Sequence, residues 1–262
     1  VLLLGDGWRT TAPRLAERVL FPAVRLDDRP RRLVQLGGAP PEEPAIEHLP
    51  CSTEALPDQL ALLRALLRGR AIAAPEPLQQ LAAMIRAASY RLLVWSIGTL
   101  PQPARMAVDA AALTRELNTL GRAIGLPLAA APGAVTTRQL LLWQAGMPDP
   151  VSCADGAPEH DPLRWSGERL LGQGATDLLV WIDAFGSRPP PVTTVPTILL
   201  SRPGVAVPAT AEVDIPVATP GLDHPGDLYR TDSVVALRAR GLRAKSLPTT
   251  AEILAAIGDR LA

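Results

Sequence analysis

Short runs of consecutive apolar residues alternate along the chain with longer segments in which leucine recurs at helical spacing. A strand that is apolar at every position needs cover on both faces, so such runs are typical of a parallel sheet flanked by helices. The runs predicted to form strands are Val1–Leu4, Leu33–Leu36, Leu92–Ile97, Asp177–Asp183 and Thr197–Leu200.

Helical spacing is clearest in three segments, where apolar residues three or four positions apart share one face. These faces are Leu56, Leu60, Leu63 and Leu67, then Leu78, Leu81, Ile85 and Ala88, then Met106, Leu113, Leu117, Leu120 and Ile124. Shorter helices are predicted at Ala12–Leu20 and Thr137–Ala145. A last helix begins at a capping box formed by Thr249 and Glu252. The alternation predicts an α/β fold with two Rossmann-like lobes, each a parallel sheet flanked by helices.

The chain has 262 residues, which is enough for two such lobes. The proline-containing stretch Ala71–Pro77 has the composition of a linker, which puts the first lobe at residues 1–72 and the second at residues 73–262. Because Val1 already lies in a strand and no methionine starts the chain, we expect the first lobe to be incomplete at its N-terminus. The second lobe is expected to contain short β segments at Glu212–Val217 and Ser233–Arg238 and the C-terminal helix.

The composition excludes several classes of protein. The 26 basic and 26 acidic side chains cancel, so the basic surface of a nucleic-acid-binding or membrane-surface protein is not expected. No apolar stretch approaches the roughly 20 residues of a membrane-spanning helix, and no signal peptide is recognisable. We therefore expect a cytoplasmic protein with neither a nucleic acid nor a membrane as its partner.

Glycines follow several of the predicted strands, at the sheet edge where open α/β folds bind their ligands. The first of these turns lacks the third glycine of a dinucleotide fingerprint, and nearby prolines remove amide donors, so a plain strand-to-helix turn is the favoured interpretation. The residues of this ancestral crevice are Gly5, Gly7, Gly98, Asp183 and Gly186.

Residues that could carry catalysis are few. His48, His160 and His224 each lack a second histidine at metal-ligand spacing, and no serine lies in a nucleophile elbow. Cys51 and Cys153 have no adjacent motif that would activate a thiolate. We therefore predict no metal ligands and no catalytic residues.

The segment Asp214–Asp232 is unusual because two glycine turns and a Tyr-Arg pair lie between β segments. In one interpretation it is a structured turn in which Tyr229 packs and Arg230 forms a salt bridge with Asp232. In the other it contacts an anionic ligand or another subunit. The sequence leaves both open.

The order of segments resembles the catalytic, pterin-binding subunit family of formylmethanofuran dehydrogenase, within the molybdopterin-dependent oxidoreductase superfamily. The resemblance is to its bacterial form, which belongs to a formyltransferase/hydrolase complex. The segments that carry it span nearly the whole chain. They are GDGWRTTAP, VQLGGAP, SYRLLVWSIGTLPQPAR, AALTRELNTLGRAIGLPL, RQLLLWQAGMP, ATDLLVWIDAFGSRPPP and VDIPVATPGLDHPGDLYRTDSVVALR.

This resemblance implies a fold like the central domains of molybdopterin oxidoreductases. It also implies a complex that moves a formyl group from tetrahydromethanopterin to a methanofuran-like carrier and hydrolyses it to formate, in one-carbon metabolism. The implied partners are a formyltransferase subunit, a metal-dependent hydrolase subunit and a further structural subunit.

The chain departs from the family at its cofactor contacts. The family's N-terminal cysteines for an iron–sulfur cluster, and its cysteine ligand to tungsten or molybdenum, have no counterpart here. Gly7 is followed by Trp8-Arg9 rather than Asn-Pro, and Leu36-Gly37-Gly38 stands where the family has Asp-Pro-Arg. The loop Ala129–Val135 has no arginine, and a Ser-Asp-Pro-Gly-Ala-His turn keeps only Asp183, Gly186 and prolines.

These losses imply a catalytically silent structural subunit without a cofactor, because an anionic bis-pterin needs many donors at once. An abandoned cavity is costly, so Trp8, Trp95 or Phe185 is expected to occupy part of the crevice. We also expect the chain to be unstable without its partners, with Pro40–Pro50 and Pro189–Pro196 docked against them.

Two alternatives remain. In the first, the chain is a redox subunit that retains molybdenum or tungsten on molybdopterin guanine dinucleotide, with cysteines upstream of Val1. In the second, it is a stand-alone nucleotide-binding domain. Metal and pterin analysis separates the first from a structural subunit, and nucleotide affinity of a monomer would support the second.

Overall fold

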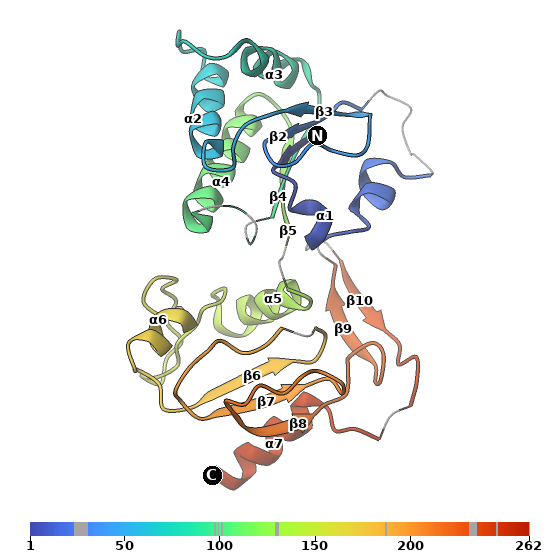
Figure 1. Cartoon of the computed structure of the whole chain (residues 1–262), viewed down its shortest axis with the longest axis vertical. Helices are drawn as coiled ribbons and strands as arrows, with labels where there is room; N and C mark the ends of the chain where they lie inside the picture. Colours follow the sequence, from blue (N-terminus) through green and yellow to red (C-terminus); the bar gives the residue numbers. More distant parts are fainter. Residues whose placement is uncertain are drawn as a thin grey trace. The chain divides into compact units, whose positions relative to one another are not determined.

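The computed structural model describes residues 1–23, 31–96, 98, 100, 102–128, 131–186, 188–230, 235–244 and 246–261. The chain divides into two compact units (Figure 1), which are described separately. Unit 1 is Val1–Ala130 and unit 2 is Ala131–Ala262.

Unit 1 is built on a five-stranded parallel sheet with the strand order β3-β2-β1-β4-β5. Its strands are β1 (Leu2–Leu4), β2 (Leu33–Leu36), β3 (Ile46–Leu49), β4 (Arg91–Ser96) and β5 (Ala123–Leu128). The first strand lies at the centre, and the chain turns outward from it in both directions. The predicted Rossmann-like α/β fold is confirmed for this unit.

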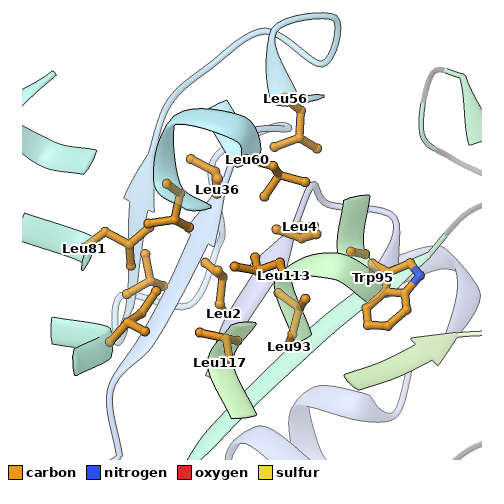
Figure 2. Close-up of a cluster of buried hydrophobic side chains, with 14 of the residues drawn as sticks. Leu2, Leu4, Leu36, Leu56, Leu60, Leu81, Leu93, Trp95, Leu113 and Leu117 are labelled. Atoms are coloured by element: carbon orange, nitrogen blue, oxygen red, sulfur yellow. The ribbon is translucent and has the colours of Figure 1, made fainter. Parts of the chain in front are cut away.

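Helices cover both faces of this sheet, as apolar parallel strands require. One face packs against α2 (Leu56–Leu67), α3 (Glu76–Ala87) and α4 (Pro103–Thr119). Figure 2 shows this cluster, in which Leu2 and Leu4 meet leucines of α2 and α4. The other face packs against α1 (Trp8–Thr11) and the short helical segment η1 (Ala16–Leu20). Alternate residues of β1 therefore enter different clusters, with Leu3 on the second face.

The predicted domain boundary after residue 72 differs from the structure. Strand β4 pairs in parallel with β1, with Leu93 opposite Leu2, so the segment after residue 72 completes the first sheet. Pro77 lies in the first turn of α3, where a missing amide hydrogen is harmless. The prolines of 71–77 therefore mark the start of a helix, and the division between units falls at residue 130.

Three further predictions in unit 1 need correction. The helix predicted to include Ile124 ends at Thr119, and Ile124 belongs to β5, whose Ala123 amide donates to the side-chain oxygen of Asn118. Strand β3 was not predicted. The helix predicted at residues 12–20 is replaced by α1 and the shorter η1.

Unit 2 contains a three-stranded parallel sheet with the order β6-β7-β8, and an antiparallel pair, β9 and β10. The strands are β6 (Leu179–Asp183), β7 (Thr197–Ser201), β8 (Ala211–Pro216), β9 (Gly226–Tyr229) and β10 (Ala236–Ala239), and the helices are α5 (Ala134–Ala145), α6 (Gly167–Gly172) and α7 (Thr250–Leu261). The predicted strands at 177–183 and 197–200 are confirmed as β6 and β7. Helix α6 and strand β9 were not predicted, and residues 233–234 of the last predicted β segment lie outside the described residues.

The predicted capping box at the start of α7 is confirmed. The Thr249 amide donates to the Glu252 carboxylate at 2.7 Å, and the Glu252 amide donates to the Thr249 hydroxyl at 3.2 Å. The first of these hydrogen bonds lowers the pKa of Glu252. Of the described helices, none combines the length and apolar character needed to cross a membrane.

The cluster beneath α4 gives a stability prediction. Leu113 is fully buried, whereas Val108 on the same helix is 68% exposed. Leu113→Ala should lower the free energy of unfolding of unit 1 by about 2–5 kcal/mol, because it leaves a cavity. Val108→Ala should change it by no more than about 0.5 kcal/mol. Urea unfolding of both variants followed by circular dichroism measures the difference, and equal effects would contradict the packing described.

Candidate functional site

The turns that follow β1 and β2 lie against each other at the carboxyl edge of the unit 1 sheet. The Ala39 amide donates to the Asp6 carboxylate at 3.1 Å, and this hydrogen bond joins the two turns. A Cβ atom on Gly38 would lie 2.7 Å from the Asp6 backbone nitrogen, and Gly38 has φ of +75°. Only glycine satisfies both conditions. The two turns thus close directly on one another.

A buried glutamine supports these turns from below. Gln35 of β2 is fully buried, and its side-chain amide donates to the carbonyls of Gly37 at 3.0 Å and Ala39 at 2.7 Å. Its side-chain oxygen accepts a hydrogen bond from the Trp8 indole at 3.3 Å. Every hydrogen bond of Gln35 named here ends on this chain, so its burial is compensated.

Arg9 lies over the outer side of Trp8. Its guanidinium stacks on the indole ring at 4.8 Å from the centroid and donates to Glu43 at 2.5 Å. Glu42 lies 3.6 Å from the same guanidinium. With its ring under Arg9 and its indole nitrogen on Gln35, Trp8 is only 3% exposed.

The end of β4 is closed by hydroxyl groups and an apolar side chain. The hydroxyls of Thr11 and Ser96 are 2.6 Å apart, and Ser96 is 1% exposed. Leu100 lies 3.2 Å from the point where a side chain on Gly5 would begin. Gly98, which follows β4, is exposed.

This geometry does not fit a phosphate or pterin cradle. Anion sites at strand ends need free amide donors and a helix N-terminus. Here the Ala39 amide is already bonded to a carboxylate, and Gly7 precedes a helix of only four residues, α1. The Asp6 carboxylate would also repel an anion.

In unit 2 the predicted residues form a similarly self-contained turn after β6. The Asp183 carboxylate accepts hydrogen bonds from the amides of Gly186 at 2.6 Å and Arg188 at 2.8 Å. The Arg202 side chain donates to the Gly186 carbonyl at 2.7 Å. Both carboxylate oxygens of Asp183 are therefore used to hold the turn. Among the other residues expected to fill the crevice, Trp95 is 6% exposed and Phe185 lies against Gly133.

The segment 214–230 is anchored by one buried carboxylate. The Asp223 side chain accepts from the Thr219 amide at 2.9 Å and from the Arg243 guanidinium at 2.5 Å. At the far end of the segment, the Tyr229 amide donates to the Thr136 hydroxyl, and its ring meets Trp143 edge-on at 5.7 Å. These contacts favour the interpretation of a packed turn.

The salt bridge predicted between Arg230 and Asp232 falls partly outside the described residues, because residues 231–234 are not among them. The Arg230 amide donates to the Val235 carbonyl at 3.0 Å.

The histidines and cysteines lie apart from these turns or serve them locally. One ring nitrogen of each histidine is hydrogen-bonded to a carbonyl, and the pairs are His48 with Gly38, His160 with Pro150, and His224 with Pro225. Burial raises the pKa of the Cys51 thiol, which keeps it protonated, and Cys153 is exposed. Within the described part of the chain, no group of three or more His, Cys, Asp or Glu side chains could hold a metal ion.

The sequence indicated the glycines at the strand ends but not the groups that close them. Gln35, Ser96 and Thr11 were not singled out, because a single polar residue inside an apolar run gives no sign of its partner. The acidic residue within Gly5-Asp6-Gly7 was the one available signal, since a carboxylate in a phosphate-binding turn is unfavourable.

Two glycines separate the effect of close approach from that of backbone strain. Gly38 and Gly69 have nearly the same φ, +75° and +74°, but a Cβ on Gly69 would meet nothing within 4 Å. Gly69→Ala should cost about 1–2 kcal/mol through strain alone. Gly38→Ala should cost clearly more, because the two turns must also move apart. Chemical denaturation of both variants measures the difference, and equal costs would show that the turns tolerate separation.

Comparison with known proteins gives one informative likeness. No protein-family model matches the chain, and no curated protein matches it significantly. The chain is similar to a chain in the crystal structure of the formyltransferase/hydrolase complex (FhcABCD) from Methylorubrum extorquens in complex with methylofuran. The two are 28% identical with a TM-score of 0.78, over 99% of this chain and 73% of the other. The likeness therefore extends through both units.

Proposed function

We propose that this chain is a structural, non-catalytic subunit of a formyltransferase/hydrolase complex. The observation that carries the proposal is the similarity to a chain of such a complex over 99% of the length, at 28% identity and a TM-score of 0.78. A likeness of this extent includes the strand ends and the connecting loops as well as the sheets.

The non-catalytic role is supported by the way the chain uses its own polar groups. Asp6, Gln35 and Asp183, which lie where a ligand would be expected, are hydrogen-bonded to neighbouring turns. A catalytic group must be free to exchange a proton or bind a reacting atom. These three side chains instead stabilise the turns.

The proposal includes no cofactor on this chain. A molybdenum or tungsten bis-pterin carries several negative charges and requires many converging donors. The turns after β1 and β6 present the carboxylates of Asp6 and Asp183 there, with amides already bonded to them. The residues present do not fit the group.

In this function the chemistry belongs to the other subunits. Formyl transfer to a methanofuran-like carrier and hydrolysis to formate would take place on the formyltransferase and metal-dependent hydrolase subunits, with a further structural subunit beside this one. This chain would hold them in place, in the cytoplasm. Its contribution to turnover is then the integrity of the assembly.

Co-expression tests the assignment. With candidate formyltransferase and hydrolase subunits from the same genome, the tagged chain should elute with them in a single peak on size-exclusion chromatography. Omitting the chain should reduce recovery of the assembled complex but leave the transferase subunit folded. Elution of the chain alone, with the other subunits assembled without it, would refute the proposal.

Metal and pterin analysis tests the absence of a redox cofactor. The full-length purified protein should contain less than about one tenth of a molybdenum, tungsten or pterin equivalent per chain, because the turns lack free donors. Mass spectrometry of the metals and fluorescence of oxidised pterin provide the measurement. About one equivalent of either metal together with pterin would establish the redox alternative.

A further inference from the structure

The two units differ greatly in how much apolar surface they bury. Of the 36 buried apolar residues in the described part of the chain, 30 belong to unit 1 and six to unit 2, although the units are nearly equal in length. Unit 2 has three parallel strands and three helices but a cluster of only three fully enclosed residues, Ala184, Leu200 and Val217. Its burial falls far short of what its sequence pattern leads one to expect.

The shortfall is concentrated on β6, at the edge of the sheet. The sequence DLLVWID is apolar at five consecutive positions, the pattern of a strand covered on both faces. Yet Leu178, Val180 and Ile182 are 47%, 39% and 47% exposed. Residues two apart along a strand share a face, so these three side chains form one exposed row, called here the β6 row.

The register shows that cover stops between β7 and β6. Val180 lies opposite Ile198, and Ile182 lies opposite Leu200. Ile253 of α7 packs on the cluster that contains Leu200 and Ile198, and Leu200 is fully buried. Helix α7 therefore covers the centre of this face, while the β6 row beside it lacks an equivalent helix among the described residues.

We propose that the β6 row is the docking surface for an amphipathic helix of another subunit. This inference rests on the proposed function, because the similar chain was solved as part of a complex of different subunits. The faces of parallel sheets are covered by helices, and α7 already provides one such helix on the same face. The row spans about 13 Å, which matches about nine residues of helix.

The chemistry of the row also defines its occupant. Its three side chains and their cross-strand neighbours Ile198 and Leu200 are all uncharged and apolar. A polar carrier or nucleotide would find no hydrogen-bond donor on them, whereas leucine or isoleucine side chains of a helix would bury the row completely. A docking helix would thus complete the layer that the sequence of β6 requires.

Two valine substitutions in the same unit provide the test. Val180→Asp places a charge in the β6 row, and Val192→Asp places the same charge on a loop residue that is 98% exposed. In the co-expressed complex, Val180→Asp should weaken retention of the partner subunits about tenfold or more, since truncation or charging of a central interface residue has effects of this size. Val192→Asp should leave retention unchanged.

The outcomes are distinguishable. Each variant is also melted as the isolated chain, where Val180→Asp should shift the melting temperature no more than Val192→Asp does. A large shift in the isolated chain would mean that the chain itself covers Val180, and would overturn the inference. So would undiminished retention of partners, or a dimer of the isolated chain that Val180→Asp dissociates. If the unmodified chain binds no partner subunit at all, the proposed function itself fails.

Discussion

A parallel strand whose residues are apolar at every position must be covered on both faces, and this constraint organises both units. In unit 1 it is met by the chain alone. Leu2 and Leu4 enter the cluster with α2, α3 and α4, while Leu3 enters the cluster with α1 and η1. In unit 2 the same kind of strand, β6, is left with one row uncovered. Unit 1 is thus complete in itself, and unit 2 has the character of an interface.

The edge of the unit 1 sheet shows how a ligand-binding architecture becomes a purely structural one. The strand order β3-β2-β1-β4-β5 brings the turns after β1, β2 and β4 to one edge, the location at which such sheets bind ligands. Asp6, Gln35 and the Thr11–Ser96 pair supply internal partners for the groups exposed there. A polar group that already has a partner gains little from a ligand. The edge is therefore satisfied without one.

Much of the fold could be predicted from the sequence because its signals are local. Strands β1, β2, β4, β6 and β7 appear as uninterrupted apolar runs, and α2 appears as a leucine repeat. Strand β5 escaped prediction because Gly125 and Pro127 interrupt it, which an edge strand tolerates. The domain boundary failed because the prolines near residue 75 have two uses, in linkers and in first helical turns. The closure of the site depends on contacts such as Trp8 with Gln35, 27 residues apart, which no local pattern reveals.

The close approach of Gly38 to Asp6 has a consequence for attempts to redesign this edge. Replacing Asp6 with a neutral residue would release the Ala39 amide, but the backbone of Gly38 would still occupy the space beside it. Enlarging Gly38 first would push the turns apart while the carboxylate remained to repel an incoming anion. Neither single change creates a binding site, and each one alone lowers stability. The two positions are coupled in such a way that a protein engineer would have to change them together, and a lineage that lost ligand binding by this route would rarely regain it one mutation at a time.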